Sequence, residues 1–181
     1  MLRRGASRPE AVAYDAFFQE RIRTLLVAPL YHSAPGRFLQ GTYQAGGSLV
    51  IPARFDAEAV LHDIERHKIT TSFMVPAMFQ RLLQLPPQTR TAYDVSSLRH
   101  VVIASAPCPA ERKAAMIDWW GPVIYEYYGS TETSALTLAS SAEAIDRPGT
   151  VGRAVSTARI EIRDPSGALC PPGTTGEIFG R

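Results

Sequence analysis

The segment Tyr125–Glu132, with the sequence Tyr-Glu-Tyr-Tyr-Gly-Ser-Thr-Glu, gathers residues whose types could do chemistry together. The ring of Tyr128 can stack on a base, and Gly129 lets the backbone approach a ligand closely. Thr131 can bond a phosphate, and Glu132 can hold a hard cation such as magnesium. These types favour a nucleotide site, although a tyrosine-rich strand end followed by a polar turn would give the same sequence.

Five short apolar runs, each bounded by proline, glycine or polar residues, predict strands that are buried on both faces. These runs are Thr24–Ala28, Ser48–Ile51, Thr71–Val75, His100–Ala104 and Val123–Tyr127. Amphipathic stretches predict helices over residues 36–45, 57–68, 76–83 and 109–120. Because the tyrosine-rich segment ends the last strand, we expect it at the carboxyl end of that strand, which borders the ligand crevice in an open parallel sheet.

The alternation of strands and helices with short links predicts an α/β fold, a parallel sheet with helices on both faces. We assign residues 1–150 to this central α/β subdomain. After Gly149 the pattern changes, because residues 158–163 alternate as a strand, residues 164–167 form a turn signal and residues 176–179 return. Residues 151–181 are therefore expected to form a β-hairpin that begins an antiparallel β subdomain.

Composition and charge limit the classes of function. A chain of 181 residues with 45 % hydrophobic and 20 % charged residues is ordinary for one globular domain. The net charge of +2, without a basic run interleaved with aromatics, gives no reason to expect nucleic acid as a partner. Cys108 and Cys170 show no metal-ligand spacing. The chain has neither a membrane span of ~20 apolar residues nor a signal-peptide pattern, so we expect a cytoplasmic protein.

Four groups of motifs resemble one family and occur in the order of that family. Tyr-Gly-Ser-Thr-Glu resembles the Tyr-Gly-x-Thr-Glu signature of the adenylate-forming (AMP-binding) enzymes, which include acyl-CoA synthetases, luciferases and peptide-synthetase adenylation domains. The proline-leucine-tyrosine-histidine segment resembles the form that is typical of fatty acid–CoA ligases. Val101–Pro109 resembles the family's strand and turn before an alanine-proline. Gly149–Ala154 and Gly176–Ile178 resemble the segments that close the acyl pocket and lead into the next subdomain. The residues are Tyr128–Glu132, Pro29–Pro35, Val101–Pro109, Gly149–Ala154 and Gly176–Ile178.

The resemblance implies an activity. In this family the carboxylate of an acid attacks the α-phosphate of ATP to give an acyl-adenylate and pyrophosphate, and a thiol, usually that of coenzyme A, then takes the acyl group. The substrate would be a small-molecule carboxylic acid, with ATP and magnesium required and coenzyme A as co-substrate. Positioning and charge neutralisation supply much of the first step.

The resemblance also implies roles for individual residues. Tyr128 would stack against adenine, Thr131 would contact the phosphate and Glu132 would ligate magnesium. His32 would lie near the acyl carboxylate as a positioning residue, so the catalytic candidates are His32, Thr131 and Glu132. The remaining nucleotide-binding candidates are Ser105, Ala106, Pro107, Tyr127, Gly129 and Ser130, and the candidates that shape the acyl pocket are Gly149 and Gly152.

The sequence departs from the family pattern in three places. Where the family commonly has glycine, this chain has Ala106, and a backbone angle that only glycine adopts freely would be strained there. The phosphate loop that ends in Pro-Lys-Gly is absent before Pro29; Ser7–Val12 faintly resembles its tail, with Glu10 in place of the lysine, and we assign it no phosphate role. The ribose-binding aspartate, the hinge and the carboxyl-terminal lid domain with the catalytic lysine are also absent.

These departures leave three interpretations open. The chain is a fragment of an ATP-dependent carboxylic acid–CoA ligase, with a fatty acid as the favoured substrate, and is inactive or nearly so alone. Alternatively it is a non-catalytic remnant that binds a nucleotide or acyl-adenylate, or an α/β scaffold without a ligand. Retention of Tyr128, Thr131 and Glu132 argues against the scaffold. Truncation would expose surfaces that the missing parts cover, so we expect self-association to a homo-oligomer through them.

Overall fold

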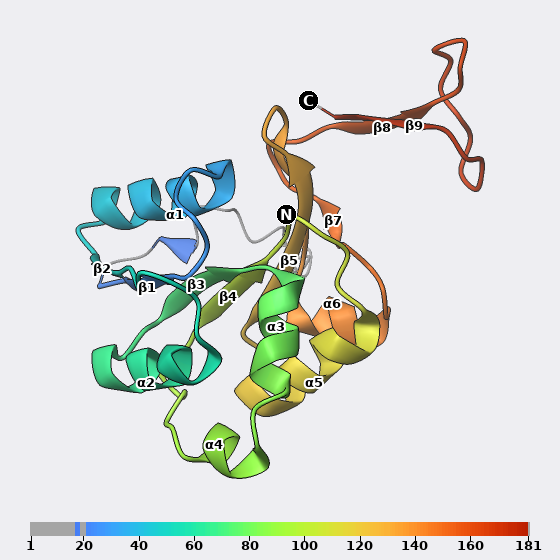
Figure 1. The fold of residues 1–181 in the computed structure, drawn as a ribbon. Helices are drawn as coiled ribbons and strands as arrows, with labels where there is room; N and C mark the ends of the chain where they lie inside the picture. Colours follow the sequence, from blue (N-terminus) through green and yellow to red (C-terminus); the bar gives the residue numbers. More distant parts are fainter. Residues whose placement is uncertain (1–16, 19–20, 181) are drawn as a thin grey trace, which may run out of the picture.

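The computed structural model describes residues 17–18 and 21–180, and its centre is a mixed seven-stranded sheet with the strand order β2-β1-β3-β4-β5-β6-β7 (Figure 1). Neighbours from β2 to β5 pair in parallel, whereas β6 and β7 are antiparallel to the strands beside them. The strands are β1 (Arg23–Leu26), β2 (Ser48–Val50), β3 (Thr71–Met74), β4 (His100–Ile103), β5 (Ile124–Ser130), β6 (Ser134–Ala139) and β7 (Arg153–Ala154). All five predicted strands are present.

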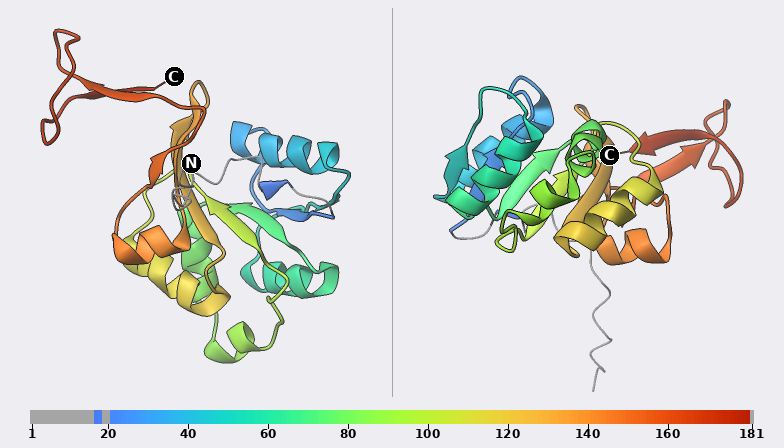
Figure 2. Two further views of the ribbon diagram at one scale, coloured as in Figure 1. Left: turned by 180° about the vertical axis from the view of Figure 1, so that it is seen from behind. Right: turned by 60° about the horizontal axis from the view of Figure 1, so that its bottom comes forward.

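Helices cover both faces of the sheet, which confirms the predicted fold class. Helix α1 lies on one face, and α2, α3 and α5 lie on the other (Figures 1 and 2). Their bounds are α1 (Ser33–Gln44), α2 (Ala57–His67), α3 (Pro76–Leu83) and α5 (Ala110–Trp120). Phe38 of α1 and Leu61 of α2 are both fully buried, as is Phe73 of the intervening β3. The apolar faces of the helices therefore enclose the sheet in one continuous core.

Several elements were not predicted. They are α4 (Pro87–Thr91), β6, α6 (Ser141–Asp146) and β7. The start of α6 had a readable signal, because Ser140 and Glu143 form a capping box in which each side chain bonds the backbone N–H of the other residue. Helix α1 begins at Ser33 rather than at residue 36, since Pro35 is tolerated in the first turn, where its missing N–H is not needed.

A separate hairpin of β8 (Ile160–Arg163) and β9 (Glu177–Gly180) extends from the body of the protein (Figures 1 and 2). The hairpin exposes the apolar side chains of Ile178 and Phe179 in β9 and of Leu169 in the segment between its strands. Because β7 belongs to the main sheet, residues 153–154 lie with the α/β body. The boundary near residue 150 and the self-association through exposed apolar surface stay predictions.

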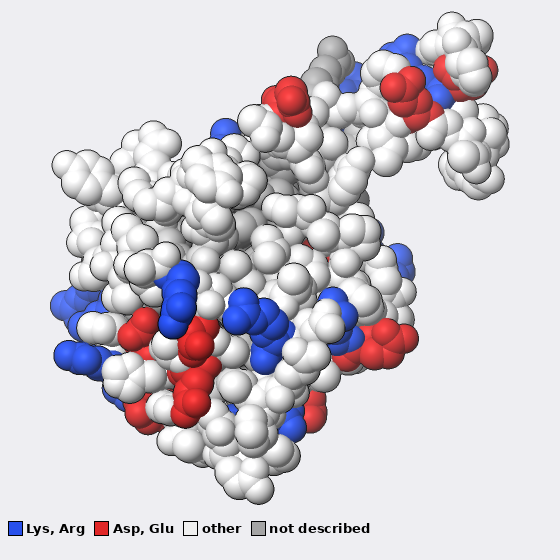
Figure 3. Space-filling view, viewed as in Figure 1, with Lys and Arg blue, Asp and Glu red and all other residues white. Residues whose placement is uncertain are grey.

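The surface charges on the face shown in Figure 3 are interspersed. Lys68 at the end of α2, for example, pairs with Asp94 at 3.0 Å. A nucleic-acid backbone is bound by a continuous basic surface, which this face does not present. Among the helices of residues 17–18 and 21–180, none is long and apolar enough to span a bilayer.

Two glycines near the carboxyl end of the sheet give a matched test of the packing. Gly149 and Gly152 both have positive φ, at 86° and 91°. A Cβ on Gly152 would lie 1.9 Å from the carbonyl oxygen of Leu138, whereas one on Gly149 would have no neighbour within 4 Å. We predict that Gly149→Ala lowers the free energy of unfolding by about 1 kcal/mol through backbone strain alone. Gly152→Ala should cost about 3 kcal/mol or more, because β6 must also move.

Urea unfolding followed by tryptophan fluorescence measures both losses. Equal losses for the two variants would contradict the close approach of residue 152 to β6.

Candidate active site

Beyond Glu126, β5 continues its strand pairing with β6 but not with β4, and the opening beside this end of the strand forms the candidate site. Pairing of β5 with β4 stops at Glu126, opposite Ile103, whereas pairing with β6 continues to Ser130. Over residues 127–130 the β4 side is therefore lined by the loop after β4 rather than by a strand. A pocket of about 280 Å³ occupies this place. It is lined by Ser105, Ala106, Pro107, Glu126, Tyr127, Tyr128, Gly129 and Val151.

A smaller hollow lies on the other side of Tyr127. It is lined by Ser33, Ala34, Arg37, Tyr127, Ser130, Thr131, Ser134 and Ala135. The hydroxyls of Ser33 and Thr131 lie 3.2 Å apart, so the start of α1 touches the turn between β5 and β6. His32 precedes Ser33 as the exposed N-cap residue of α1, and its ring centroid lies 4.4 Å from that of Tyr31. His32 is thus next in the chain to Ser33, which lines the hollow with Thr131, but His32 itself lines neither the hollow nor the pocket.

The turn after β5 holds its polar side chains in a fixed arrangement. The backbone N–H of Ser130 donates to Thr133 Oγ1, and that of Thr133 donates to Ser130 Oγ, each at 3.2 Å. The Ser130 hydroxyl also holds the pKa of the Glu132 carboxyl below its usual range. Thr131 and Glu132 are exposed. The arrangement presents an ionised Glu132 carboxylate next in the chain to the Thr131 hydroxyl, which contacts the Ser33 hydroxyl.

The surroundings of Glu132 fit a magnesium ion that is shared with phosphate. Within the described part of the chain, no group of three or more acidic, histidine or cysteine side chains could hold a metal ion. Glu132 would therefore be a single protein carboxylate at such an ion. That is the usual situation for magnesium, which keeps several waters and binds through one or two carboxylates plus phosphate oxygens.

Gly129 is required by the strand geometry as well as by any ligand. The register of β5 and β6 shifts between Tyr128 and Gly129, as in a β-bulge. A Cβ on Gly129 would lie 1.8 Å from the carbonyl oxygen of Ser134. No side chain fits there, so glycine permits the close cross-strand approach that shapes this end of β5.

The loop after β4 carries its backbone strain one residue earlier than expected. Ser105 has φ 75°, in the left-handed region, whereas Ala106 is not among the described residues with positive φ. Ala106 therefore does not adopt the backbone angle that would be strained for a residue other than glycine. Ala106 needs only a small side chain, and Ser105 carries the strained turn.

A buried ion pair beneath the pocket escaped the sequence analysis. Lys113 of α5 pairs with Glu126 of β5, and their side chains are 3 % and 5 % exposed. The same ammonium donates to the carbonyl oxygen of Thr150 at 3.2 Å. A signal existed, because Lys113 shares a helix face with Met116 and Ile117, and Glu126 follows Ile124 on one face of a strand. Two opposite charges at positions predicted to be buried indicate a pair.

The two cysteines differ in how deeply they are buried. Burial and the Glu126 carboxylate raise the pKa of the Cys108 thiol to about 11, so near neutral pH it is protonated and unreactive. Cys170 is a half-buried free thiol.

Gly152 packs on β6 next to the pocket residue Val151, whereas Gly149 faces open space. The acyl-pocket role of both glycines stays a prediction, and Ser7–Val12 lies outside the described residues.

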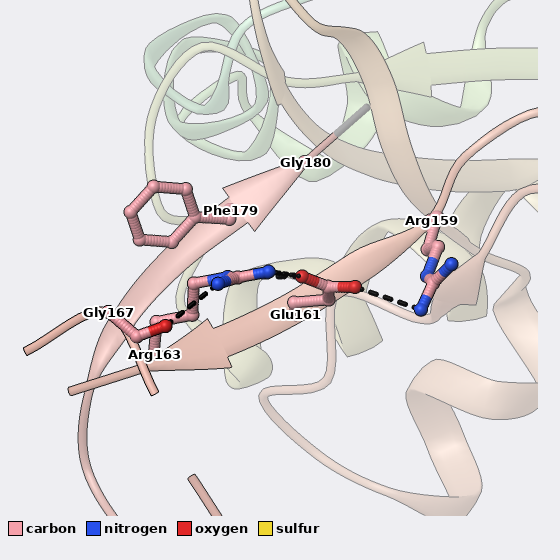
Figure 4. Close-up of a pocket in the computed structure, with 6 residues that line it drawn as sticks. All are labelled: Arg159, Glu161, Arg163, Gly167, Phe179 and Gly180. Carbon is pink, nitrogen blue, oxygen red and sulfur yellow. Dashed lines mark hydrogen bonds and ion pairs between the residues drawn. The ribbon is translucent and has the colours of Figure 1, made fainter. Parts of the chain in front are cut away.

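The hairpin has a hollow of its own, of about 380 Å³, shown in Figure 4. Glu161 lies between two arginines, 3.0 Å from Arg159 and hydrogen-bonded to Arg163. The guanidinium of Arg163 lies 5.6 Å from the ring centre of Phe179. None of the candidate residues from the sequence lines this hollow.

Comparison with known proteins gives a consistent result. The family model described as "AMP-binding enzyme" matches residues 6–181. A feruloyl-CoA synthase from Amycolatopsis sp is 34 % identical over 86 % of this chain and 32 % of its own length. The medium/long-chain-fatty-acid–CoA ligase FadD8 of Mycobacterium tuberculosis is also 34 % identical, over 86 % of this chain and 27 % of its own. The chain thus spans about a third of the length of these relatives.

Solved structures resemble the fold closely. The amide bond synthetase McbA from Marinactinospora thermotolerans is 32 % identical, with a TM-score of 0.84 over 91 % of this chain and 34 % of its own. The o-succinylbenzoate coenzyme A synthetase MenE of Bacillus subtilis, solved with ATP and magnesium, is 27 % identical. Its TM-score is 0.77, over 90 % of this chain and 33 % of its own. These comparisons confirm the family that the motifs indicated.

Substitution by glycine tests where the loop after β4 is strained. We predict that Ser105→Gly leaves the free energy of unfolding unchanged or raises it by up to about 1 kcal/mol, because glycine relieves the positive φ. Ala106→Gly should lower it by about 0.5–1 kcal/mol through the added freedom of the unfolded chain. Urea denaturation of the two variants gives the comparison, and the reverse order would place the strain at residue 106.

The two cysteines should differ in reactivity. With a pKa of about 11, Cys108 should be alkylated by iodoacetamide at pH 8 far more slowly than Cys170, because its thiolate fraction is about 0.001 there. Raising the pH toward 11 should speed the reaction of Cys108, with mass spectrometry of the peptides as the measurement. Equal rates at pH 8 would contradict the buried environment of Cys108.

Proposed function

This chain belongs to the AMP-binding enzyme family, and we propose that it supplies the nucleotide and acyl-adenylate site of an ATP-dependent carboxylic acid–CoA ligase. The observation that carries the proposal is the pocket beside the carboxyl end of β5. It joins the loop Ser105–Pro107 to Tyr127–Gly129, and Thr131 and Glu132 follow directly in the chain. A flat aromatic ring, close backbone, a hydroxyl and an ionised carboxylate are what a nucleoside phosphate needs at one place.

The first step forms an acyl-adenylate. A carboxylate oxygen of the acid attacks the α-phosphorus of ATP, and the bond from that phosphorus to the leaving pyrophosphate breaks. Tyr128 stacks on the base and Thr131 bonds an α-phosphate oxygen, so both hold the phosphorus in line with the acid. Glu132 would hold magnesium, which when bound neutralises phosphate charge. His32, next to Ser33 in the chain, orients the carboxylate of the acid.

The second step transfers the acyl group. The sulfur of coenzyme A attacks the acyl carbon, the thiol proton leaves to solvent, and AMP departs with the electrons of the acyl–oxygen bond. The residues of this chain keep the adenylate in place during this exchange. We further propose a cytoplasmic location, where Cys108 and Cys170 would stay reduced and free.

The acid is proposed to be a fatty acid, on the form of the Pro29–Pro35 segment. FadD8, with a medium- or long-chain fatty acid in its name, and the feruloyl-CoA synthase are equally similar to this chain. Binding experiments should therefore compare a fatty acyl group with a feruloyl group on the same adenylate mimic.

Calorimetric titration with non-hydrolysable acyl-sulfamoyl adenosines tests the site. We predict that Tyr128→Ala weakens binding tenfold or more, about 1.4 kcal/mol, because the base loses its stacking partner. Tyr43→Ala is the matched control, because Tyr43 is 79 % exposed on α1. This variant should bind the ligand as tightly as the wild type does. Tighter binding of the hexadecanoyl mimic than of the feruloyl mimic would support a fatty acid as the substrate. Equal binding by the Tyr128→Ala variant would exclude this crevice.

A further inference from the structure

The pair of Lys113 and Glu126 has no role in the chemistry proposed above, yet it lies at the pocket. Glu126 lines the pocket, and so does Val151, the residue after Thr150. The ammonium of Lys113 pairs with Glu126 and donates to the carbonyl oxygen of Thr150. One buried side chain from α5 therefore bonds both the pocket residue Glu126 of β5 and the residue that precedes the pocket residue Val151.

Stability alone gives a weak reason for this pair. Removing two charges from water offsets most of their mutual attraction, and well-packed apolar residues of similar volume are often as stable. The distinctive effect of Lys113 is directional, because an ammonium can donate to a carboxylate and to a carbonyl at once. An apolar side chain would fill the same space without bonding Thr150.

The other contacts of the 150–152 stretch lead to β6 rather than to β5. Thr137 of β6 donates to the carbonyl oxygen of Val151 at 2.6 Å, and Gly152 packs against the carbonyl oxygen of Leu138. The N–H of Gly152 bonds within the stretch, to Thr150 Oγ1 at 3.0 Å. On the amino-terminal side, a Cβ on Gly149 would have no neighbour. The N–H of Thr150 donates to the carbonyl oxygen of Arg147 at 3.1 Å, within the same loop. Among the described hydrogen bonds of Thr150, the Lys113 contact is thus the one that ties this residue to α5 and, through the ion pair, to the pocket residue Glu126.

We propose that Lys113 is a positioning residue of the pocket, which fixes Thr150 and Val151 so that Val151 forms a pre-formed part of the pocket wall. The pocket is then in its binding shape before a ligand arrives, which reduces the ordering cost of binding. The identity of the ligand as an adenylate rests on the proposed function, whereas the fixed wall does not.

The test replaces the pair in the whole 181-residue chain. Lys113→Met/Glu126→Met exchanges the two charges for apolar side chains, so its midpoint in urea should stay close to that of the wild type. Hydrogen exchange of the peptide over residues 147–153 should nevertheless become about tenfold faster or more, since Thr150 loses its anchor. Arg112→Met is the matched control. It removes a positive charge from the same helix, at a side chain that bonds Gln80 instead, and it should leave this peptide unchanged.

A second variant separates the two bonds of the Lys113 ammonium, and it is compared with the wild type under conditions in which both are folded. Glu126→Gln keeps the ammonium of Lys113 on the Thr150 carbonyl, so residues 147–153 should stay protected. Wild-type protection of this peptide in the folded double variant would overturn the proposal, as would its loss in Glu126→Gln alone.

Titration with the acyl-sulfamoyl adenosine gives a separate readout. If Lys113 positions the pocket wall, the double variant should bind this ligand about fivefold or more weakly, although its stability is unchanged. If the pair only stabilises the fold, the double variant should bind as tightly as the wild type, because its stability is that of the wild type. Absence of binding to the wild type would refute the proposed function, and the exchange experiment would still decide the role of Lys113.

Discussion

The constraint on which the site depends is the change of strand direction at β5. This strand pairs in parallel with β4 and antiparallel with β6, and the antiparallel partner is longer at the carboxyl end. In a purely parallel sheet, a helix would follow β5 and carry the chain back to the amino end of the sheet before the next strand begins. Here the chain turns back within three residues, so the turn with Thr131 and Glu132 stays at the carboxyl end of β5. The loops that follow β1 and β4 lie at the same end of the sheet.

Strain and close contacts gather at this edge. Ser105 and Ser134 have positive φ, at 75° and 62°, and Gly129 approaches Ser134 too closely for any side chain. Such conformations cost on the order of 1–3 kcal/mol each for residues other than glycine, and they persist where the surrounding structure determines them. Elsewhere the sheet is held by ordinary apolar packing against the helices on its two faces, so the core supplies the stability that offsets this strain.

The sequence predicted the parallel core well because its strands are apolar runs separated by proline, glycine and polar turns. The clustering of Ser105–Pro107 with Tyr127–Gly129 also followed from one rule, that carboxyl ends of parallel strands share an edge. Strand β6 was missed because Ser134–Ala139 is rich in small residues, and only its pairing with β5 makes it a strand. The Lys113–Glu126 contact joins residues 13 apart in a helix and a strand, and its geometry depends on how α5 packs.

The three-residue turn after β5 also has a kinetic consequence. Strands β1 and β3 pair across 47 residues, from Thr24 to Thr71, whereas β5 and β6 are adjacent in the chain. Closing a short loop costs little chain entropy, and hairpins form in microseconds, well before sheets that pair distant segments. The segment that holds the tyrosine-glycine-serine-threonine-glutamate motif can thus close with its neighbouring strand at a small entropic cost, whereas the parallel strands must bring distant segments together.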